Sequence, residues 1–84
     1  MKDITINCAG LEDKAQLHEA LARALDFPDW YGKNLDALYD CLTELDSVHL
    51  HLVGWQQLGT WKAGFDAVLS DAENDCLDFT VSYE

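Results

Sequence analysis

Two aspartates one helical turn apart, Asp36 and Asp40, are the residues of this sequence best suited to bind a cation or a cationic surface. On a helix they lie about 40° apart, with Tyr39 and Thr43 beside them. Like charges at this spacing repel by roughly 0.2–0.5 kcal/mol in an isolated helix, and only Asp36 is near enough to the helix start to recover much of that cost from the helix dipole. The pair therefore indicates an acidic binding face.

An aromatic segment, Trp30-Tyr31-Gly32, lies directly ahead of this helix. Aromatic side chains next to carboxylates are typical of a protein interface that is directed at cationic groups. The alternative is that Trp30 and Tyr31 pack beneath the loop and that the aspartates only solvate the helix. The residue pattern by itself leaves both interpretations open.

The helix that carries the aspartates is predicted from about Leu35 to Leu45, with Asn34 as its N-cap. Its four leucines, at positions 35, 38, 42 and 45, fall within about 80° of one another on the side opposite to Asp36 and Asp40. Because the leucines must face a core, we expect the two aspartates and Tyr39 to face outward.

A first helix is predicted ahead of this segment. Asp13 and Gln16 form a capping-box pattern, and leucines then recur at every fourth residue from Leu17 to Leu25. The helix is expected to end at Phe27-Pro28, because the residue before a proline avoids helical dihedral angles.

Short alternations of apolar and polar residues predict strands at residues 4–6, 48–52 and 77–81. Gly54 closes the second of these strands. Trp55 in the turn that follows is predicted to anchor the core, and an interface role is the alternative. The start of a last helix is left open, because Gly64 costs roughly 1 kcal/mol relative to alanine. The apolar residues at helical spacing in this last helix are Trp61, Phe65, Val68, Leu69 and Ala72.

The resulting order of elements is β-α-α-β-α-β. Strands separated by helical crossovers predict the α/β class, with a small three-stranded parallel sheet and three to four packed helices. The length of 84 residues suits one domain with one modest core, which we expect to span residues 1–84.

The charge balance restricts the partners. Sixteen acidic residues against five basic ones give a formal net charge of −11, which repels nucleic acid and anionic membranes and attracts a basic protein. The alternative is that the negative charge only keeps the protein soluble and does not serve to attract a partner. No apolar stretch approaches the roughly 20 residues that span a bilayer, and the amino terminus has no signal-peptide pattern. We therefore expect a cytoplasmic protein that binds neither membrane nor nucleic acid.

Other chemistries find little support. Asp36 and Asp40 could bind a metal or act as acid and base, but no histidine or nucleophile has motif spacing near them and no glycine-rich phosphate loop occurs. His49 and His51 share a strand face that is predicted to be solvated or covered by a helix. We expect no enzymatic activity, no metal and no cofactor.

An odd number of cysteines without a C-x-x-C pair predicts small buried residues rather than disulfides or a zinc site; they are Cys8, Cys41 and Cys76.

The segment 27–43 resembles the core of the barstar family, intracellular inhibitors of extracellular ribonucleases of the barnase type. The similarity is carried by the specific string Y-G-x-N-L-D-A-L-aromatic-D-C-L-T, which runs from Tyr31 to Thr43. The resemblance spans nearly the whole chain, with a shorter segment between the second strand and the last helix. It implies a fold of three parallel strands with packed helices. Weaker similarities are Leu17-His18, Asp71-Ala72, Cys76, Asp78 and Thr80.

This resemblance implies that the outer face of the second helix and the loop before it insert into a ribonuclease active site. Asp40 matches the family's central acid, which occupies the substrate-phosphate pocket, and Asp36 matches a second acid on the same face. Trp30 and Tyr39 stand where the family has a tyrosine and a tryptophan. The expected contact set also includes Gly32, Asn34, Leu35, Thr43, Glu44 and, at its periphery, Asp71.

The family implies an antidote or immunity protein of a bacterial cytoplasm that binds one basic ribonuclease, or the ribonuclease domain of a toxin, in a one-to-one complex. Glu44 and Leu45 replace a glycine and a tryptophan of the family, so whether they contact the partner stays open. The nuclease is either the cell's own secreted enzyme or a toxin delivered by a competitor. The alternative function is a nonspecific acidic module, such as a nucleic-acid mimic or a regulator of a basic protein, whose binding would fall steeply with salt.

Overall fold

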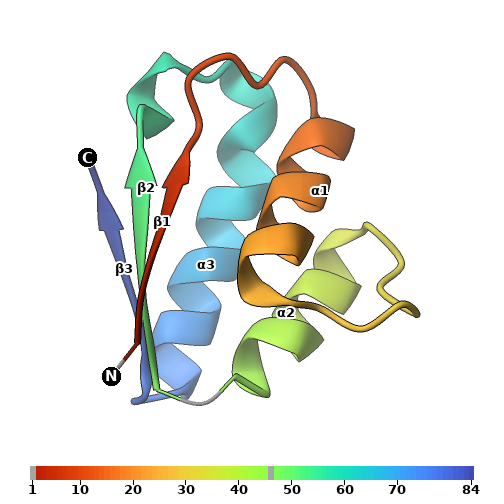
Figure 1. Cartoon of the computed structure of the whole chain (residues 1–84), viewed down its shortest axis with the longest axis vertical. Coiled ribbons are helices and arrows are strands. Elements are labelled where there is room, and N and C mark those ends of the chain that lie inside the picture. Colours follow the sequence, from red (N-terminus) through yellow and green to blue (C-terminus); the bar gives the residue numbers. More distant parts are fainter. Residues whose placement is uncertain (1, 46) are drawn as a thin grey trace.

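The computed structural model describes residues 2–45 and 47–84, which form three strands and three α-helices together with two short 3-10 turns (Figure 1). The order β-α-α-β-α-β that the sequence predicts is confirmed. The elements are β1 (Lys2–Asn7), α1 (Lys14–Leu25), α2 (Leu35–Thr43), β2 (Val48–Val53), η1 (Trp55–Gln57), η2 (Thr60–Lys62), α3 (Ala63–Asp75) and β3 (Phe79–Tyr83).

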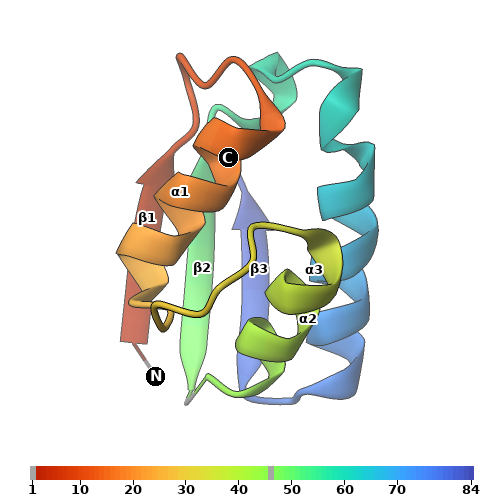
Figure 2. The ribbon, with the colours of Figure 1, turned by 90° about the vertical axis from the view of Figure 1, so that its right-hand side faces the viewer.

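The strands form one parallel sheet in the order β1-β2-β3, so that β2 is central. Val48 of β2 lies opposite Lys2 of β1 and Phe79 of β3. The helices cover one face of this sheet, which Figures 1 and 2 show from two directions. The predicted α/β class is thereby confirmed, because parallel neighbours require crossover connections of the kind that these helices provide.

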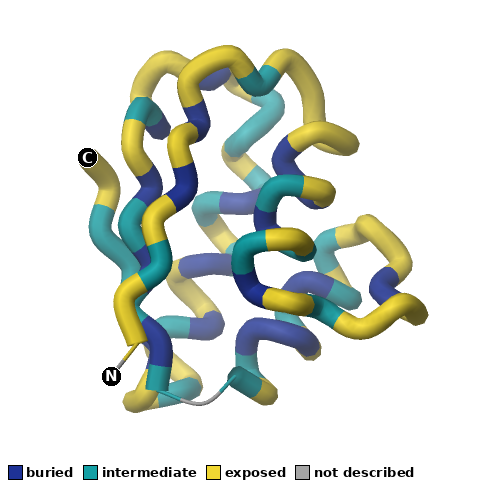
Figure 3. Tube along the Cα trace, in the orientation of Figure 1, coloured by how far each residue is buried: buried dark blue, intermediate teal, exposed yellow. Residues whose placement is uncertain are grey.

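The core lies between the sheet and the helices. Figure 3 shows buried segments of the strands and helices facing one another, while the connecting loops are mostly exposed. Trp55 is 2% exposed and its Nε1 donates a hydrogen bond to Asp66 Oδ1 at 2.7 Å, so its predicted role as a core anchor is confirmed. Among the described residues, those with no exposed surface are Cys8, Leu17, Leu21, Leu38, Leu42, Leu50, Leu52, Leu69, Ala72 and Phe79.

The first helix begins as predicted and ends slightly early. The carboxylate of Asp13 accepts a hydrogen bond from the Gln16 N–H at 2.9 Å, which confirms it as the N-cap. The helix ends at Leu25, before the predicted end at Phe27-Pro28. The reason is Asp26, whose φ of 55° lies in the left-handed region and whose N–H closes back on the Ala22 carbonyl.

The last strand starts later than predicted. Leu77 is 92% exposed and lies ahead of β3, so its assignment to the strand was wrong. The Phe79 N–H donates to the Cys76 carbonyl at 3.2 Å, which closes a turn after α3 before the strand begins. The alternating apolar pattern that predicted the strand thus begins with Leu77, whose side chain lies in the turn and points into solvent.

Gly64 has a packing role that its sequence position does not reveal. A Cβ atom at this position would lie 2.7 Å from Leu35 Cδ1, closer than such atoms approach in proteins. The absence of a side chain lets the first turn of α3 pack against the first residue of α2. The helix start that the sequence left open is at Ala63, directly after the η2 turn.

The two strand histidines lie on the face of the sheet that the helices do not cover. His49 and His51 alternate along β2 with fully buried leucines and are half-buried themselves. His49 uses both ring nitrogens within the sheet, with Nδ1 2.5 Å from Thr80 Oγ1 and Nε2 2.8 Å from Ser82 Oγ. Of the two predicted environments, the face without a helix is the one observed.

His51 of β2 connects β1 with the residue that follows β3, and it should make stability depend on pH. Its Nδ1 lies 2.6 Å from Glu84 Oε2 and its Nε2 lies 3.3 Å from Asp3 Oδ1. The hydrogen bond with Glu84, and then that with Asp3, raise the pKa of His51 above its ordinary value of 6.5. When the pKa of a histidine is higher in the folded state than in the unfolded state, its protonation stabilises the fold. This stabilisation is complete at a pH below the unfolded-state pKa and is lost as pH rises through the folded-state pKa.

We therefore expect the difference in melting temperature between the parent and His51→Gln to be largest just below the ordinary imidazole pKa of 6.5 and to shrink as pH rises above it. Thermal unfolding of both proteins on both sides of this pKa, with the imidazole titrated by NMR, measures the effect. A difference that grows with pH would contradict the expectation. Lys2→Gln, which changes an exposed β1 side chain outside this hydrogen-bonded group, is the control.

Candidate functional site

The second helix and the loop before it project from the helical layer on the side away from the sheet (Figures 1 and 2). The helix begins at Leu35 because Asn34 has an extended backbone, with φ −133°, and its side-chain oxygen accepts the Ala37 N–H at 2.8 Å. The predicted N-cap is thus confirmed. The cap places the first turn of α2, with Asp36, at the outer edge of the molecule.

The two faces of α2 differ as the leucine spacing predicts. Leu38 and Leu42 have no exposed surface, whereas Asp36 and Asp40 are exposed on the other side. Neither carboxylate forms a hydrogen bond or an ion pair within the described part of the chain. The salt bridges found there are those of His51 with Asp3 and Glu84. A rigid, anchored helix therefore presents two unpaired negative charges to solvent.

The carboxyl end of α2 differs from the prediction. The helix ends at Thr43 and not at Leu45, because the Glu44 N–H turns back to the Cys41 carbonyl at 3.3 Å in a tighter turn. The Thr43 hydroxyl lies 3.1 Å from the carbonyls of Tyr39 and Asp40 and is thus used within the helix. Glu44 is exposed, whereas Leu45 is half-buried against the core.

The two aromatic residues of the loop point in opposite directions. Trp30 is 62% exposed, while Tyr31 is 8% exposed. The Tyr31 ring packs against Phe27, with ring centroids 4.9 Å apart, and its hydroxyl lies 2.5 Å from His18 Nδ1. The alternative in which both aromatic residues pack beneath the loop therefore holds for Tyr31 and is wrong for Trp30. Gly32 and Lys33, which follow, are exposed.

The contact between Tyr31 and His18 attaches the loop to α1. Burial, reinforced by the charges of Lys33 and Lys14, lowers the pKa of His18, and burial raises the pKa of Tyr31. Both groups are thus held in their neutral forms and share one hydrogen bond. This bond sets the direction of the loop that exposes Trp30.

Tyr31→Phe is expected to destabilise the fold by about 1–3 kcal/mol, because it leaves the buried His18 nitrogen without its partner. Urea unfolding followed by circular dichroism measures the loss. Tyr83→Phe is the matched control, since the hydroxyl of this more exposed tyrosine has no hydrogen-bond partner among the described residues and its removal should change stability by less than about 0.5 kcal/mol. Equal effects of the two substitutions would contradict the assigned role of Tyr31.

Tyr39 is held between α2 and α3. It was expected to face outward, but it is half-buried and packs against the core. Its hydroxyl donates a hydrogen bond to the carboxylate of Asp75 on α3. That bond, together with desolvation and the negative charges of Asp75, Asp71 and Asp40, raises the pKa of Tyr39. The reason for the difference is that α3 packs beside α2 and covers part of the ring.

Carboxylates from both helices surround Tyr39 and form one acidic seam, defined here as Asp40 of α2 with Asp71 and Asp75 of α3. All three are exposed. Asp71 was expected at the periphery of the binding face, and its place in the seam is compatible with that position. Asp75 was not predicted. Its spacing of four residues from Asp71 repeats the pattern of the α2 aspartates and could have indicated it.

Among the described residues, no group of three or more histidine, cysteine and acidic side chains is placed to hold a metal ion. Over the same residues, no helix has the length and apolar character needed to cross a bilayer. All three cysteines are free thiols; Cys8 and Cys41 are buried as expected, and Cys76 is half-buried. The outer face of α2 thus presents the exposed carboxylates of Asp36 and Asp40, and the loop before it presents the exposed indole of Trp30.

Comparison with known proteins gives a family for this chain. The family model described as "Barstar (barnase inhibitor)" matches residues 1–83. A protein of Bacillus subtilis (strain 168) named "Putative ribonuclease inhibitor YrdF" is 49% identical over 53 residues, which are 63% of this chain and 58% of that protein. The chain thus spans under two thirds of the length of this relative. Because the family model covers almost every residue and the parallel α/β fold is the one that the family implies, the chain belongs to the barstar family.

Proposed function

We propose that this protein inhibits a ribonuclease of the barnase type by inserting the outer face of α2 into the enzyme's basic active site. The observation that carries the proposal is the pair Asp36 and Asp40. Both are exposed, neither has a cationic partner among the described residues, and their helix is capped and anchored at its core face. The family description and the name of the relative support the choice of a ribonuclease as the target.

The proposed mechanism is phosphate mimicry. A ribonuclease collects positive side chains where it holds the phosphates of RNA, and a carboxylate can accept charge-assisted hydrogen bonds from the same groups. Asp40 is proposed to occupy the centre of that site, with Asp36 one turn earlier. Because Leu38 and Leu42 hold the helix to the core, little conformational freedom is lost on binding.

The loop and the neighbouring helix complete the proposed face. Trp30 offers an exposed indole that can stack on the nuclease, in the manner of aromatic anchors at protein interfaces. Asn34 uses its carbonyl oxygen to cap α2 and has a long contact of 3.4 Å from its amide nitrogen to the Gly32 carbonyl, so its amide can still donate to a partner. The acidic seam extends the negative surface toward α3.

The charge of the whole chain should assist the encounter. A net charge of −11 attracts a basic enzyme over distances set by the ionic strength. The complex is proposed to contain one copy of each protein and to form in the cytoplasm, either before the nuclease is exported or after a competitor's toxin arrives.

The direct test is titration of the purified chain into a barnase-type ribonuclease with a fluorogenic RNA substrate, at about 0.15 M salt. Stoichiometric inhibition that is complete near an equimolar ratio is expected. Glu12→Ala removes one exposed charge from the loop between β1 and α1 and should inhibit as the parent does. Inhibition that needs a large excess of the chain and disappears in moderate salt would instead favour a nonspecific acidic module.

A further inference from the structure

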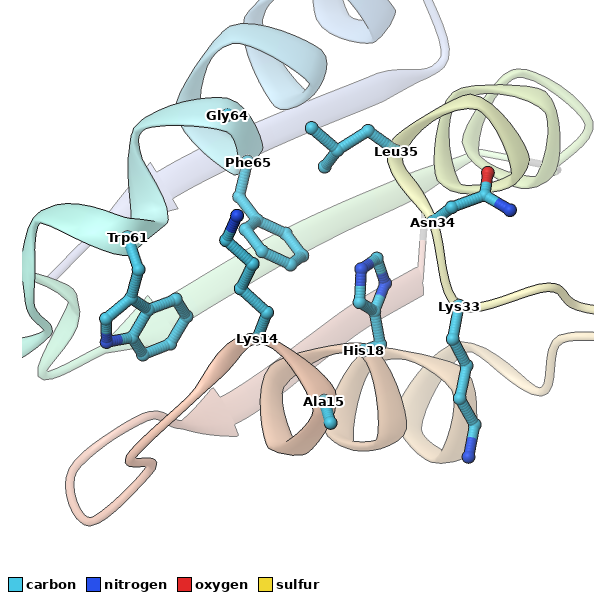
Figure 4. A pocket seen from close by; sticks show the side chains of 9 residues that line it. All are labelled: Lys14, Ala15, His18, Lys33, Asn34, Leu35, Trp61, Gly64 and Phe65. Carbon is cyan, nitrogen blue, oxygen red and sulfur yellow. The ribbon is translucent and has the colours of Figure 1, made fainter.

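A pocket of about 440 Å³ lies where the three α-helices begin (Figure 4). It is separate from the acidic seam and borders the proposed binding face only through Asn34 and Leu35. Its volume is within the range that small-molecule sites in proteins typically have. The lining residues are Lys14, Ala15, His18, Lys33, Asn34, Leu35, Trp61, Gly64 and Phe65.

The walls of this pocket are apolar and largely aromatic. Trp61 and Phe65 meet edge to face, with ring centroids 6.2 Å apart at 83°. His18 packs against the other side of Phe65, with centroids 4.7 Å apart. The Leu35 side chain points into the same space in Figure 4. A flat apolar group could be enclosed on several sides here.

The charge of the lining is opposite to that of the molecule. Two of the five basic residues of the chain, Lys14 and Lys33, line this pocket, and none of the acidic residues that the structure describes does. Figure 4 shows Lys14 reaching across the pocket between Trp61 and His18, while the Lys33 side chain extends away from the aromatic residues. The amino-terminal ends of the helices add partial positive charge around the same opening.

A buried polar group faces the pocket. His18 is 4% exposed, and Figure 4 shows its ring pointing into the cavity. Its Nδ1 contacts Tyr31, whereas its Nε2 makes no hydrogen bond among the described residues. Because no fully buried side-chain nitrogen or oxygen of these residues lacks a partner, Nε2 is accessible from the pocket. An atom of this kind, in a cavity that also holds an ammonium group, offers a ligand a second polar contact.

We propose that this pocket binds a small organic anion, an aromatic ring that carries one carboxylate or comparable acidic group. The ring lies against Trp61, Phe65 and Leu35, and the acidic group pairs with the ammonium of Lys14 and reaches His18. The site does not depend on the proposed ribonuclease, because all of its contacts come from this chain.

The test uses naphthoate as the probe and naphthylmethanol as its uncharged counterpart of similar shape. Each is titrated into the full chain alone, and binding is followed through amide NMR shifts. Naphthoate is expected to bind about tenfold or more tightly than the alcohol, with the shifts gathered around the pocket. Acetate, which has the charge but no ring, is expected to bind far more weakly than naphthoate.

Three variants locate the charge that is responsible. Lys14→Gln should weaken naphthoate binding by about tenfold, Lys33→Gln should weaken it less, and Lys2→Gln, on β1, should leave it unchanged. All three replace exposed side chains, so unfolding curves should match the parent. Equal affinity for the acid and the alcohol, equal effects of Lys14→Gln and Lys2→Gln, or shifts centred outside the pocket would overturn the proposal. None of these results would bear on ribonuclease inhibition.

Discussion

Asp40→Ala is expected to weaken inhibition of the cognate ribonuclease by about 100-fold to several thousand-fold, more than any other single change on the outer face of α2. On binding, the Asp40 carboxylate would be buried among positive groups that normally hold phosphate. Removing one member of a buried ion pair leaves the other uncompensated and costs about 3–5 kcal/mol, and each 1.4 kcal/mol corresponds to about tenfold in affinity. Inhibition titrations of the parent and the variant against the same enzyme measure the change.

The same substitution should leave the folded state almost unaffected. Asp40 is exposed, and its carboxylate makes no hydrogen bond within the described residues. Changes of this kind usually alter stability by less than about 0.5 kcal/mol. Urea unfolding of Asp40→Ala is therefore the necessary companion measurement. If Asp40→Ala inhibits as tightly as the parent, Asp40 is not part of the binding site. The wider proposal that the protein is a ribonuclease inhibitor is tested separately, by the equimolar titration.

Leu38→Ala is expected to have the opposite pattern, with a loss of about 2–5 kcal/mol in the free energy of unfolding. Leu38 has no exposed surface and lies on the core face of α2, beneath the aspartates. Truncation removes buried methyl groups and leaves a cavity that the surrounding core can fill only in part. Small domains have only about 5–15 kcal/mol of stability, so this is a large fraction.

The folded fraction of Leu38→Ala should still inhibit, because Asp36 and Asp40 keep their places on the outer face. Urea unfolding gives the stability, and inhibition is measured at a temperature where the variant remains folded. Leu77→Ala is the matched control, since this leucine is 92% exposed and should change stability by less than about 0.5 kcal/mol. A Leu38→Ala protein that is as stable as the parent would contradict the assigned core face of α2.

Much of the framework of this site could be predicted from neighbouring residues alone. The cap at Asn34 and the separation of Leu38 and Leu42 from the aspartates depend on helical spacing within about one or two turns. The order of strands and helices follows from local periodicities of the same kind. The ends of elements were less predictable, because Asp26 and Glu44 terminate the first two helices through backbone hydrogen bonds that no simple residue pattern indicates.

The amino-acid sequence by itself therefore determined the elements, their order and the existence of an acidic helix face. Only the tertiary structure decided that Trp30 is displayed while Tyr31 is bonded to His18, that Tyr39 meets Asp75, and where the pocket forms. The physical reason is distance along the chain. Tyr39 and Asp75 are 36 positions apart, and their contact depends on how α2 and α3 pack, which periodicity within either helix does not specify.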